Sequence, residues 1–418
     1  MKETLKKIIA EGWAPRPDCI MRHKVPAELA LKKPSIVITG PRRAGKSYAA
    51  YEMQGLIGEN GVRGRNFAYI NFEDERLEGF RKENFDEIIE AYHEMREEKP
   101  ALFLDEIHNV AGWEQFVRRL ADAGYKVVVT GSNSRMLSRE IAQKLGGRFT
   151  EIRVFPLDFR EFLKFRGMDF QKEHFYSQEK FTAIKHFGEY FEYGGFPEVA
   201  LLFGADSNNR LLQTYVDRVF YKDLVGKKKL ENEAALKFAI KKIRECIGKA
   251  VSPSAIYSAA KSAGIEAGPN TFEKYVDYLE EALLTVPCLP FAKSVRKQER
   301  KKRYFVDNGY IKLLEVKEDK SIQLENLVFM ELAKKGRAAA FHQGKKECDF
   351  IIDGKQAVQA TYELHLGNEE REIGGLLEAM AAYGIKKGTI VTFGQEKEMQ
   401  REGKKISVVP AWKWCLQI

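Results

Sequence analysis

A glycine-rich segment at residues 40–47 carries the clearest chemical signal in the chain. Its sequence, GPRRAGKS, has the spacing GxxxxGK(S/T), follows the apolar run SIVIT and precedes a helical pattern. In such a loop successive backbone N–H groups wrap phosphate oxygens, Lys46 reaches the β and γ phosphates, and the Ser47 hydroxyl binds Mg²⁺. The sequence therefore predicts an ATP and Mg²⁺ site built from Gly40, Pro41, Arg42, Arg43, Ala44, Gly45, Lys46 and Ser47.

An acidic pair follows the apolar run ALFL, at the point where a strand would end. We expect Asp105 to help bind Mg²⁺ and Glu106 to polarise the attacking water, which would make the protein a hydrolase. The later run KVVVTG ends before Ser132 and Asn133, and either side chain could orient the same water. For these two residues, a turn selected for its glycine and hydroxyl is the alternative.

A transferred phosphoryl group also needs positive charge nearby, because its own charge redistributes in the transition state. Arg148, in the segment LGGRFTEI, is the first candidate, and Arg135 and Arg139 are alternatives. If the nucleotide lies between subunits, this arginine would act on the ATP of a neighbouring subunit. A solvated surface arginine is the competing interpretation for each of the three.

Four short apolar runs, separated by helical patterns, must position these groups. The runs lie at residues 35–40, 66–72, 101–106 and 126–131. Buried strands that alternate with helices predict a parallel α/β sheet. The glycine-rich loop follows the first of these strands, and the acidic pair stands at the end of the third.

These residues resemble a known group, the AAA-type P-loop ATPases of archaea and bacteria that carry a winged helix and a degenerate restriction-endonuclease-like C-terminal domain. The resemblance rests on six segments in order: GPRRAGKS, YINFEDERL, LFLDEIHNV, TGSNSRMLSREIAQKLGGR, RVFPLDFREFL and YGGFPEV. It implies nucleotide positions for Lys46, Ser47, Asp105 and Glu106. It also implies that Arg148, after Gly147, is the arginine supplied to a neighbouring subunit. In the last two segments, phenylalanines at helical spacing favour a buried core over a functional surface.

The region from residue 231 to 315 has the pattern of a winged helix. Short helices start near Ser252 and Pro269, and two strands then flank a basic turn. The second helix carries acids that would meet phosphates unfavourably, whereas Asn270 and Lys274 would tolerate DNA, so we expect sequence-independent backbone binding. The predicted phosphate contacts are Arg296, Lys297, Arg300, Lys301, Lys302 and Arg303. In the alternative, the turn is solvated and the module packs against another subunit.

The C-terminal segment follows the order of a restriction-endonuclease-like fold, with Glu325 first, Asp349 on a middle strand and Gln359-x-Thr361 on the next. An active nuclease of this kind needs a carboxylate and a lysine at the last pair, to bind metal and activate water. Both residues of that pair are neutral here, so we expect the domain to be an inactive nuclease. Glu363 is the nearby carboxylate that could substitute.

The composition of the 418 residues suits several globular domains. Hydrophobic residues make up 44% and charged residues 31%, proportions that exclude a disordered or fibrous chain. The patterns divide the chain into an ATPase core, a helical extension, a winged helix and a nuclease-like domain, at residues 1–155, 156–230, 231–315 and 316–418. The 69 lysines and arginines exceed the 60 acids by nine, which permits a polyanionic partner.

Neither a membrane span nor a signal peptide is apparent in the sequence. No run approaches the ~18 apolar residues of a transmembrane helix, and the N-terminus lacks a signal peptide's apolar stretch. We therefore expect a cytoplasmic protein without a membrane partner. The five cysteines are scattered and form no CxxC pair, so we expect reduced thiols.

The leading functional hypothesis is a Mg²⁺-dependent ATPase that couples ATP binding and hydrolysis to assembly of a ring or other homo-oligomer and to binding or remodelling of DNA, with branched DNA as one candidate. A second hypothesis is an ATP-dependent regulatory switch that acts on a protein partner. A third is an ATP-regulated nuclease of a mobile element or defence system. Salt-dependent DNA affinity separates the first from the second, and metal-dependent cleavage tests the third.

Overall fold

The computed structural model divides the chain into two compact units, residues 1–155 and 156–418, and each is described by itself. The described residues are 1–14, 20–22, 28, 35–59, 66–132, 143–147, 149–226, 230, 232–292, 301–314 and 319–418. The boundaries predicted at residues 230 and 315 fall inside the second unit and remain predictions.

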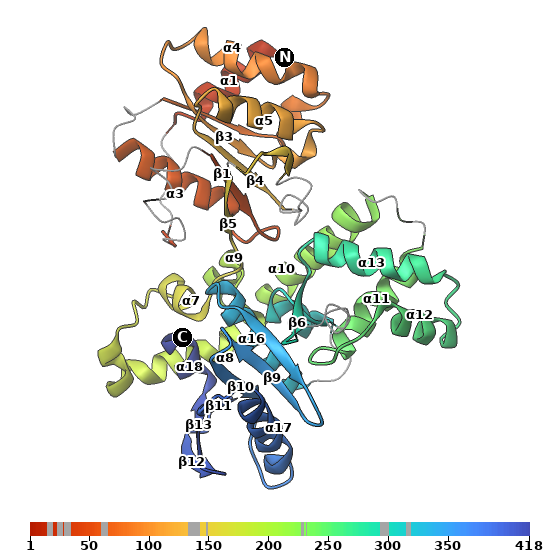
Figure 1. The fold of residues 1–418 in the computed structure, drawn as a ribbon. Helices are drawn as coiled ribbons and strands as arrows, with labels where there is room; N and C mark the ends of the chain where they lie inside the picture. Colours follow the sequence, from red (N-terminus) through yellow and green to blue (C-terminus); the bar gives the residue numbers. More distant parts are fainter. Residues whose placement is uncertain are drawn as a thin grey trace. The chain divides into compact units, whose positions relative to one another are not determined.

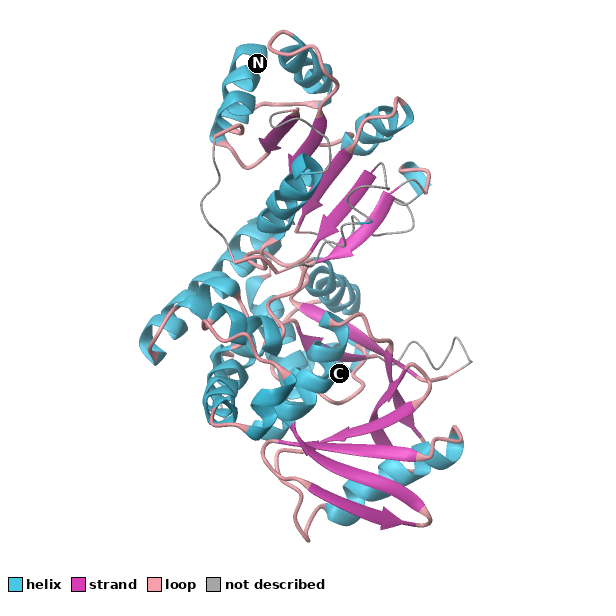
Figure 2. Ribbon diagram, turned by 90° about the vertical axis from the view of Figure 1, so that its left-hand side faces the viewer, coloured by secondary structure: helices cyan, strands magenta, loops and turns pink. Residues whose placement is uncertain are grey.

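A parallel sheet of five strands forms the centre of the first unit (Figures 1 and 2). The strands, in the spatial order β2-β3-β4-β1-β5, are β1 Ser35–Thr39, β2 Phe67–Asn71, β3 Ala101–Asp105, β4 Val127–Gly131 and β5 Phe149–Arg153. The predicted parallel α/β fold is confirmed, and its four apolar runs form β1 to β4. Strand β5 was not predicted, because its sequence FTEIR lacks an apolar run and lies half-exposed at the edge of the sheet.

Helices cover both faces of this sheet. They are α1 Lys2–Glu11, α3 Lys46–Glu59, α4 Phe85–His93 and α5 Trp113–Asp122, with 3₁₀ turns η1 Glu75–Leu77, η2 Lys82–Asn84 and η3 Ile107–Asn109. In β1, Ile36 and Ile38 pack with Met53 of α3, whereas Val37 packs with side chains of α1, α4 and α5 on the opposite face. Successive strand residues point to opposite faces, so a continuous apolar run fits a strand that is buried on both sides.

The second unit is richer in helices. They are α7 Phe159–Phe165, α8 Glu179–Tyr193, α9 Pro197–Leu201, α10 Ala205–Arg218, α11 Glu233–Glu245, α12 Pro253–Ser262, α13 Pro269–Glu281, α15 Asn308–Leu313, α16 Lys320–Lys334, α17 Glu369–Ala382 and α18 Ala411–Gln417, with the 3₁₀ helix η5 Lys172–Tyr176 and the π-helix η6 Val219–Gly226. Helix α12 starts where predicted, because Pro253 occupies its first turn and the Ser252 hydroxyl accepts a hydrogen bond from the Ala255 N–H at 3.2 Å.

A mixed sheet of eight strands completes the second unit (Figure 2). In the spatial order β12-β13-β11-β10-β9-β8-β6-β7, the strands are β6 Thr285–Pro290, β7 Lys302–Phe305, β8 Ala339–Gln343, β9 Glu347–Ile352, β10 Gln356–Ala360, β11 Lys387–Thr392, β12 Lys397–Arg401 and β13 Lys404–Pro410. Helix α17 packs on β9, β10 and β11, while α16 contacts β7, β8 and β10.

The β6–β7 hairpin, expected to be the wing of a winged helix, belongs to this same sheet. Strand β6 pairs antiparallel with β7 and parallel with β8, where Leu289 lies opposite Ala340. The hairpin strands are therefore shared with the region beyond residue 315, and side chains on β7 lie between the two predicted modules.

The two aromatic segments of the second unit form its core. Phe159, Phe162 and Phe196 are fully buried, which confirms the core interpretation of both segments. A Cβ on Gly195 would lie 2.3 Å from the Leu157 carbonyl oxygen, so that position requires glycine. The Gly195 N–H donates to the carboxylate of Asp307 at 2.8 Å, which connects this turn to the start of α15.

Within the described ranges, no helix is both long and apolar enough to cross a bilayer. Four of the five cysteines are described, and Cys246, Cys288, Cys348 and Cys415 are free thiols. Cys19 lies outside the described residues.

Candidate active site

The glycine-rich loop connects the end of β1 to the start of α3, as the sequence predicts. A Cβ on Gly40 would lie only 2.0 Å from the Val154 carbonyl oxygen, so the loop can pass this point only with glycine. Gly45 has a φ of +95° and Arg43 a φ of +65°, both in the left-handed region. These turns bring the loop back to the first residue of α3, Lys46, where backbone N–H groups at a helix N-terminus favour an anion.

The Lys46 ammonium is buried between the loop and the end of β3. Its Nζ lies 3.1 Å from the Glu106 Oε1 and donates to the Pro41 carbonyl oxygen at 3.2 Å. Burial raises the pKa of the Glu106 carboxyl, but Lys46, with help from His108 and Arg42, lowers it to about 2. Glu106 is therefore ionised, and its negative charge depends on the lysine that the sequence assigns to phosphate.

Asp105 holds three hydroxyl groups around one carboxylate. The Ser47 hydroxyl donates to its Oδ2 at 2.7 Å, and the Tyr69 hydroxyl donates to the same oxygen at 2.5 Å. The Thr130 hydroxyl donates to Oδ1 and also accepts the Glu106 N–H at 3.0 Å. The end of β3 is thus held by side chains from β2, from β4 and from α3.

This arrangement fits a magnesium ion that is shared with a nucleotide. Mg²⁺ is commonly bound by one or two protein oxygens together with phosphate oxygens and waters, and the adjacent Ser47 and Asp105 offer such a pair. Across the described part of the chain, no group of three or more His, Cys, Asp or Glu side chains is arranged to hold a metal by itself. The predicted metal residues therefore suit an ion that arrives with phosphate.

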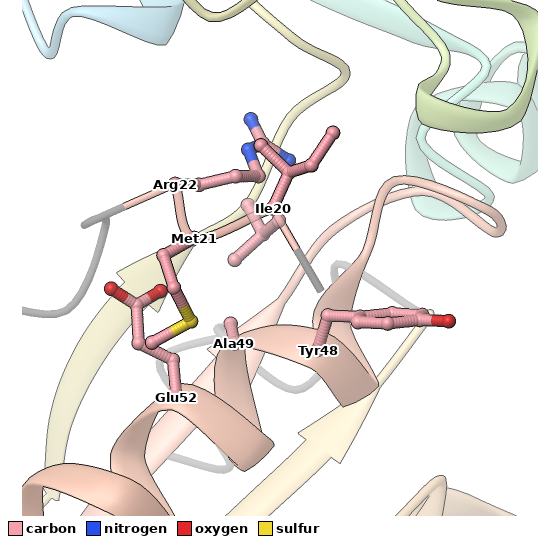
Figure 3. Close-up of a pocket in the computed structure, with 7 residues that line it drawn as sticks. Ile20, Met21, Arg22, Tyr48, Ala49 and Glu52 are labelled. Atoms are coloured by element: carbon pink, nitrogen blue, oxygen red, sulfur yellow. The ribbon is translucent and has the colours of Figure 1, made fainter. Parts of the chain in front are cut away.

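A pocket that sequence reasoning missed lies beside the start of α3 (Figure 3). Ile20, Met21 and Arg22 come from the segment before β1 and face Tyr48 and Glu52 of the helix. The complete lining is Ile20, Met21, Arg22, Tyr48, Ala49, Glu52 and Val154. The Arg22 guanidinium donates to the carbonyl oxygens of Ala44, in the glycine-rich loop, at 2.7 Å and of Phe155 at 2.9 Å. The pocket is therefore connected to the loop itself.

The structure brings together four of the residues predicted for nucleotide chemistry: Lys46, Ser47, Asp105 and Glu106. Arg42 donates to Glu73 at 2.8 Å, and Ser132 is buried just after β4. Tyr69 and Thr130 were not predicted as site residues. Asn133, Arg135, Arg139 and Arg148 lie outside the described residues.

The predicted DNA contacts have mixed positions. Asn270 and Lys274 are exposed on α13, while Arg296, Lys297 and Arg300 lie outside the described residues. Lys302 is 0% exposed and Arg303 5%, which corrects their assignment as surface cations.

The physical reason for this correction is that hairpin cations are paired with nearby acids. Arg303 donates to Glu280 of α13 at 2.8 Å, and Lys301 lies 3.9 Å from the same carboxylate. Lys302 is enclosed by three carboxylates of the C-terminal region. Glu280 of α13 thus faces the protein's own hairpin.

The residues predicted for a degenerate nuclease lie close together. The Gln359 carboxamide oxygen accepts the Asp349 N–H at 3.2 Å, and its NH₂ group donates to Glu372 at 2.7 Å. Thr361 donates to the backbone oxygen of Glu363 at 3.3 Å, and the Glu363 side chain is exposed. At the two decisive positions the structure therefore contains neutral side chains engaged in local hydrogen bonds.

Comparisons with known proteins identify the kind of domain that contains this site. A family model described as an AAA domain matches residues 32–163, and a domain of unknown function matches residues 184–320. An uncharacterized protein of Methanocaldococcus jannaschii is 32% identical over 91% of this chain and 88% of its own length. An uncharacterized protein of Haemophilus influenzae is 30% identical over 91% of this chain and 94% of its own length.

Among solved structures, Cdc6p from Pyrobaculum aerophilum overlaps with 68% of this chain and 86% of its own, at 13% identity and a TM-score of 0.28. That score is too low to support an inference. The AAA-domain match and the strand order identify the fold of the first unit.

Proposed function

We propose that this chain, which belongs to the family of the Methanocaldococcus jannaschii and Haemophilus influenzae relatives, is a Mg²⁺-dependent ATPase. Its AAA domain lies at residues 32–163. The observation that carries the proposal is the Lys46–Glu106 ion pair beside the Ser47–Asp105 hydrogen bond. One lysine, one hydroxyl and two carboxylates thereby surround the N-terminus of α3, where phosphate would bind.

The chemistry follows from a change of partner at Lys46. When ATP binds, the ammonium pairs with β and γ phosphate oxygens in place of Glu106. The pKa of Glu106 then rises, because burial opposes its charge and the strongest attraction that lowers the pKa is lost. Glu106 becomes a base that can accept a proton from water as the water oxygen attacks the γ phosphorus, and ADP and inorganic phosphate are released.

The Asp105 carboxylate is held for a different task. Mg²⁺ bound by Ser47 and Asp105 would supply charge neutralisation at the β and γ oxygens. Tyr69 and Thr130 fix the carboxylate from two neighbouring strands, so its oxygens need little reorganisation when the nucleotide binds.

The pocket beside α3 marks the side of the phosphate loop on which we propose that the nucleotide base binds. It is lined mainly by apolar atoms of Ile20, Met21 and Ala49, with the Tyr48 ring at its side, and it adjoins the phosphate loop through Arg22 (Figure 3). The pocket itself has a volume of only about 10 Å³, enough for one water molecule, so a purine would have to displace the side chains that line it.

Phosphate release by the full chain tests the proposal. With Mg²⁺ and ATP we expect steady release of inorganic phosphate, and with excess EDTA we expect none. A preparation that binds ATP but releases no phosphate above the buffer rate would reduce the proposal to a nucleotide-binding protein.

We also propose self-association, with Arg148 acting on the ATP of a neighbouring subunit. Support comes from the resemblance of the preceding segment to AAA-type ATPases and from Gly147, whose φ of +70° marks a turn directly before the arginine. Arg148→Ala should lose turnover but keep ATP affinity, and mixing it with Glu106→Gln should restore part of the activity at shared interfaces. Normal turnover by Arg148→Ala would transfer the role to Arg135 or Arg139.

Sequence-independent DNA binding through the hairpin is the proposed use of the ATPase. Its support is the basic turn and the exposed Asn270 and Lys274 on α13. Replacing Arg296, Lys297, Arg300 and Lys301 with alanine should weaken binding to unrelated sequences equally and flatten the salt slope, by up to about 0.9 for each phosphate that is no longer neutralised. Unchanged affinity at every salt concentration would remove the hairpin from DNA binding.

A regulatory switch that acts on a protein partner is the second candidate. The observation that favours it is the burial of Lys302 and Arg303, which removes two of six hairpin cations from the surface. In that case ATP would change the protein's association with its partner, and DNA affinity would stay weak at physiological salt.

A further inference from the structure

A lysine of the hairpin ends inside an acidic cluster of the C-terminal region. The Nζ of Lys302, on β7, lies 2.5 Å from Glu347 Oε1, 3.4 Å from Glu325 Oε1 and 3.7 Å from Asp349 Oδ1. The lysine is 0% exposed. We call these four side chains the Lys302 cluster. They come from β7, from α16 and from β9, which are separate in sequence and meet only through the fold.

The surroundings hold the carboxylates in place. The Tyr304 hydroxyl, also on β7, donates to Glu325 Oε1 at 2.7 Å. A Cβ on Gly248, in the turn after α11, would lie 2.3 Å from Glu325 Oε2, so this glycine leaves room for the carboxylate. Asp349 Oδ2 accepts the Ala360 N–H at 2.9 Å. Groups from the predicted winged helix thus enclose Glu325 and Asp349, the acids that the resemblance assigns to a nuclease-type centre.

Charge explains why the lysine must be there. Glu325 and Asp349 are only 14% and 8% exposed and lie beside the more exposed Glu347, so their charges repel, and a buried carboxylate without a cation is strongly destabilising. Burial and the neighbouring Glu325 raise the pKa of Asp349, while Lys302 lowers it. Among the described residues, Lys302 is the cation that lies within 4 Å of all three carboxylates.

We propose that the Lys302 ammonium takes the place of a divalent cation in the nuclease-type acidic centre, and thereby holds the β6–β7 hairpin against the C-terminal sheet. In this arrangement the ion pairs of Lys302 connect β7 of the hairpin to α16 and β9 of the C-terminal region. The neutral residues Gln359 and Thr361, where a nuclease needs a carboxylate and a lysine, and the buried Lys302 are then two parts of one arrangement. Strands β6 and β7 are thus part of the eight-stranded sheet, and the stability of that sheet does not require a metal ion.

The proposal predicts a gain of cation dependence when the ammonium is removed. Lys302→Met keeps the aliphatic stem but leaves the acids without their cation. In buffer with EDTA, its unfolding midpoint for the second unit should fall by roughly 10 °C, the size expected for a broken buried ion pair. Adding Mn²⁺ or Ca²⁺ in place of EDTA should restore most of that loss, because a divalent ion can occupy the vacated position.

Two controls separate this effect from nonspecific stabilisation. Wild type contains the nucleotide site as well, so any response of the parent to Mn²⁺ is subtracted. Lys301→Met changes the neighbouring lysine, which lies 3.9 Å from Glu280, and should show neither the loss nor the recovery.

A second variant keeps the test decisive if Lys302→Met does not fold. Adding Glu325→Gln and Asp349→Asn removes the repulsion, so the triple variant should fold in EDTA and show no response to Mn²⁺. A Lys302→Met protein as stable as wild type, or one destabilised but insensitive to both ions, overturns the proposal. So does a triple variant that fails to fold when Lys302→Met also fails.

Discussion

Lys46 and Lys302 are both buried and both face carboxylates, and they differ in what else surrounds them. Lys46 meets a single acid, Glu106, and otherwise a loop carbonyl in a glycine-rich turn at a helix N-terminus. Lys302 meets three acids and is enclosed by paired strands and a packed helix. A buried lysine paired with carboxylates can therefore either exchange its partner for a ligand or hold two parts of the fold together.

The difference lies in the alternatives that each lysine has. A phosphate bound at the loop offers Lys46 two or more anionic oxygens, together with the N–H groups of the loop, so leaving Glu106 is offset. For Lys302, no described group other than the cluster lies within ion-pairing distance, and moving it would leave three acids without a cation. We expect mutations at the two lysines to have opposite signatures, loss of ligand binding at one and loss of stability at the other.

The largest effect should follow Lys46→Ala. Removing the ammonium deletes its interactions with the phosphates and should weaken ATP binding about 100-fold or more, since truncating one partner of a buried charge pair costs about 2–5 kcal/mol or more. Isothermal titration with ATP and Mg²⁺ measures this. Lys7→Ala, which changes an exposed lysine on α1 of the same unit, should bind as wild type does. Retained affinity in Lys46→Ala would contradict the exchange of partners.

Acid should weaken the first unit through Glu106. Its pKa is about 2 in the folded chain and 4.5 as an ordinary side chain, so its contribution to stability is present above pH 4.5 and is lost as the pH falls through 2. The contribution is at most about 3 kcal/mol. Urea unfolding without nucleotide, from pH 6 to pH 2.5, should show a steeper loss in wild type than in Glu106→Gln. Parallel curves would mean that the ion pair contributes little.

Thr130→Val should slow turnover and change ATP affinity little. The hydroxyl holds both Asp105 and the Glu106 N–H, and the isosteric valine removes only these hydrogen bonds. We expect a loss of roughly 30-fold in kcat, equivalent to about 2 kcal/mol. Thr150→Val on the edge strand β5 is the matched control. A KM effect without a kcat effect would assign Thr130 to substrate binding.

The smallest effect should come from Tyr69→Phe, which removes one of three hydroxyl groups that bind Asp105. One hydrogen bond to a charged group is worth about 1.5 kcal/mol, so the Mg²⁺ concentration for half-maximal activity should rise about 10-fold. Tyr51→Phe removes a hydroxyl that donates to the Tyr69 hydroxyl at 3.2 Å, and it should change the half-maximal Mg²⁺ concentration less than Tyr69→Phe does. Equal effects in the two variants would show that the Tyr69 hydroxyl is not held for Asp105.

The glycine-rich loop and the acidic pair could be predicted from sequence because their chemistry needs fixed spacing within a few residues. The strands that position them were also predictable, since each is a continuous apolar run. Tyr69 and Thr130 lie inside such runs, and nothing local marks a hydroxyl that will face Asp105 from another strand. Only the strand order brings them together.

The prediction that Lys302 is a surface cation was wrong for a related reason. In a run of cations the sequence favours a solvated turn, and no local pattern tells which lysine points into the sheet. Its burial depends on β6 pairing with β8, a pairing between segments about fifty residues apart. The identity of its three acidic partners follows from that pairing and from the packing of α16 against β7.

The most direct test of the central claim is to measure ATP binding and ATP turnover in Glu106→Gln and in wild type under the same conditions. Glutamine keeps the shape of the side chain but cannot accept the proton of the attacking water, and it no longer competes for Lys46. We predict that the variant binds ATP at least as tightly as wild type and hydrolyses it about 100-fold more slowly or worse. Hydrolysis at the wild-type rate would contradict the account, because Glu106 would then be only the resting partner of Lys46.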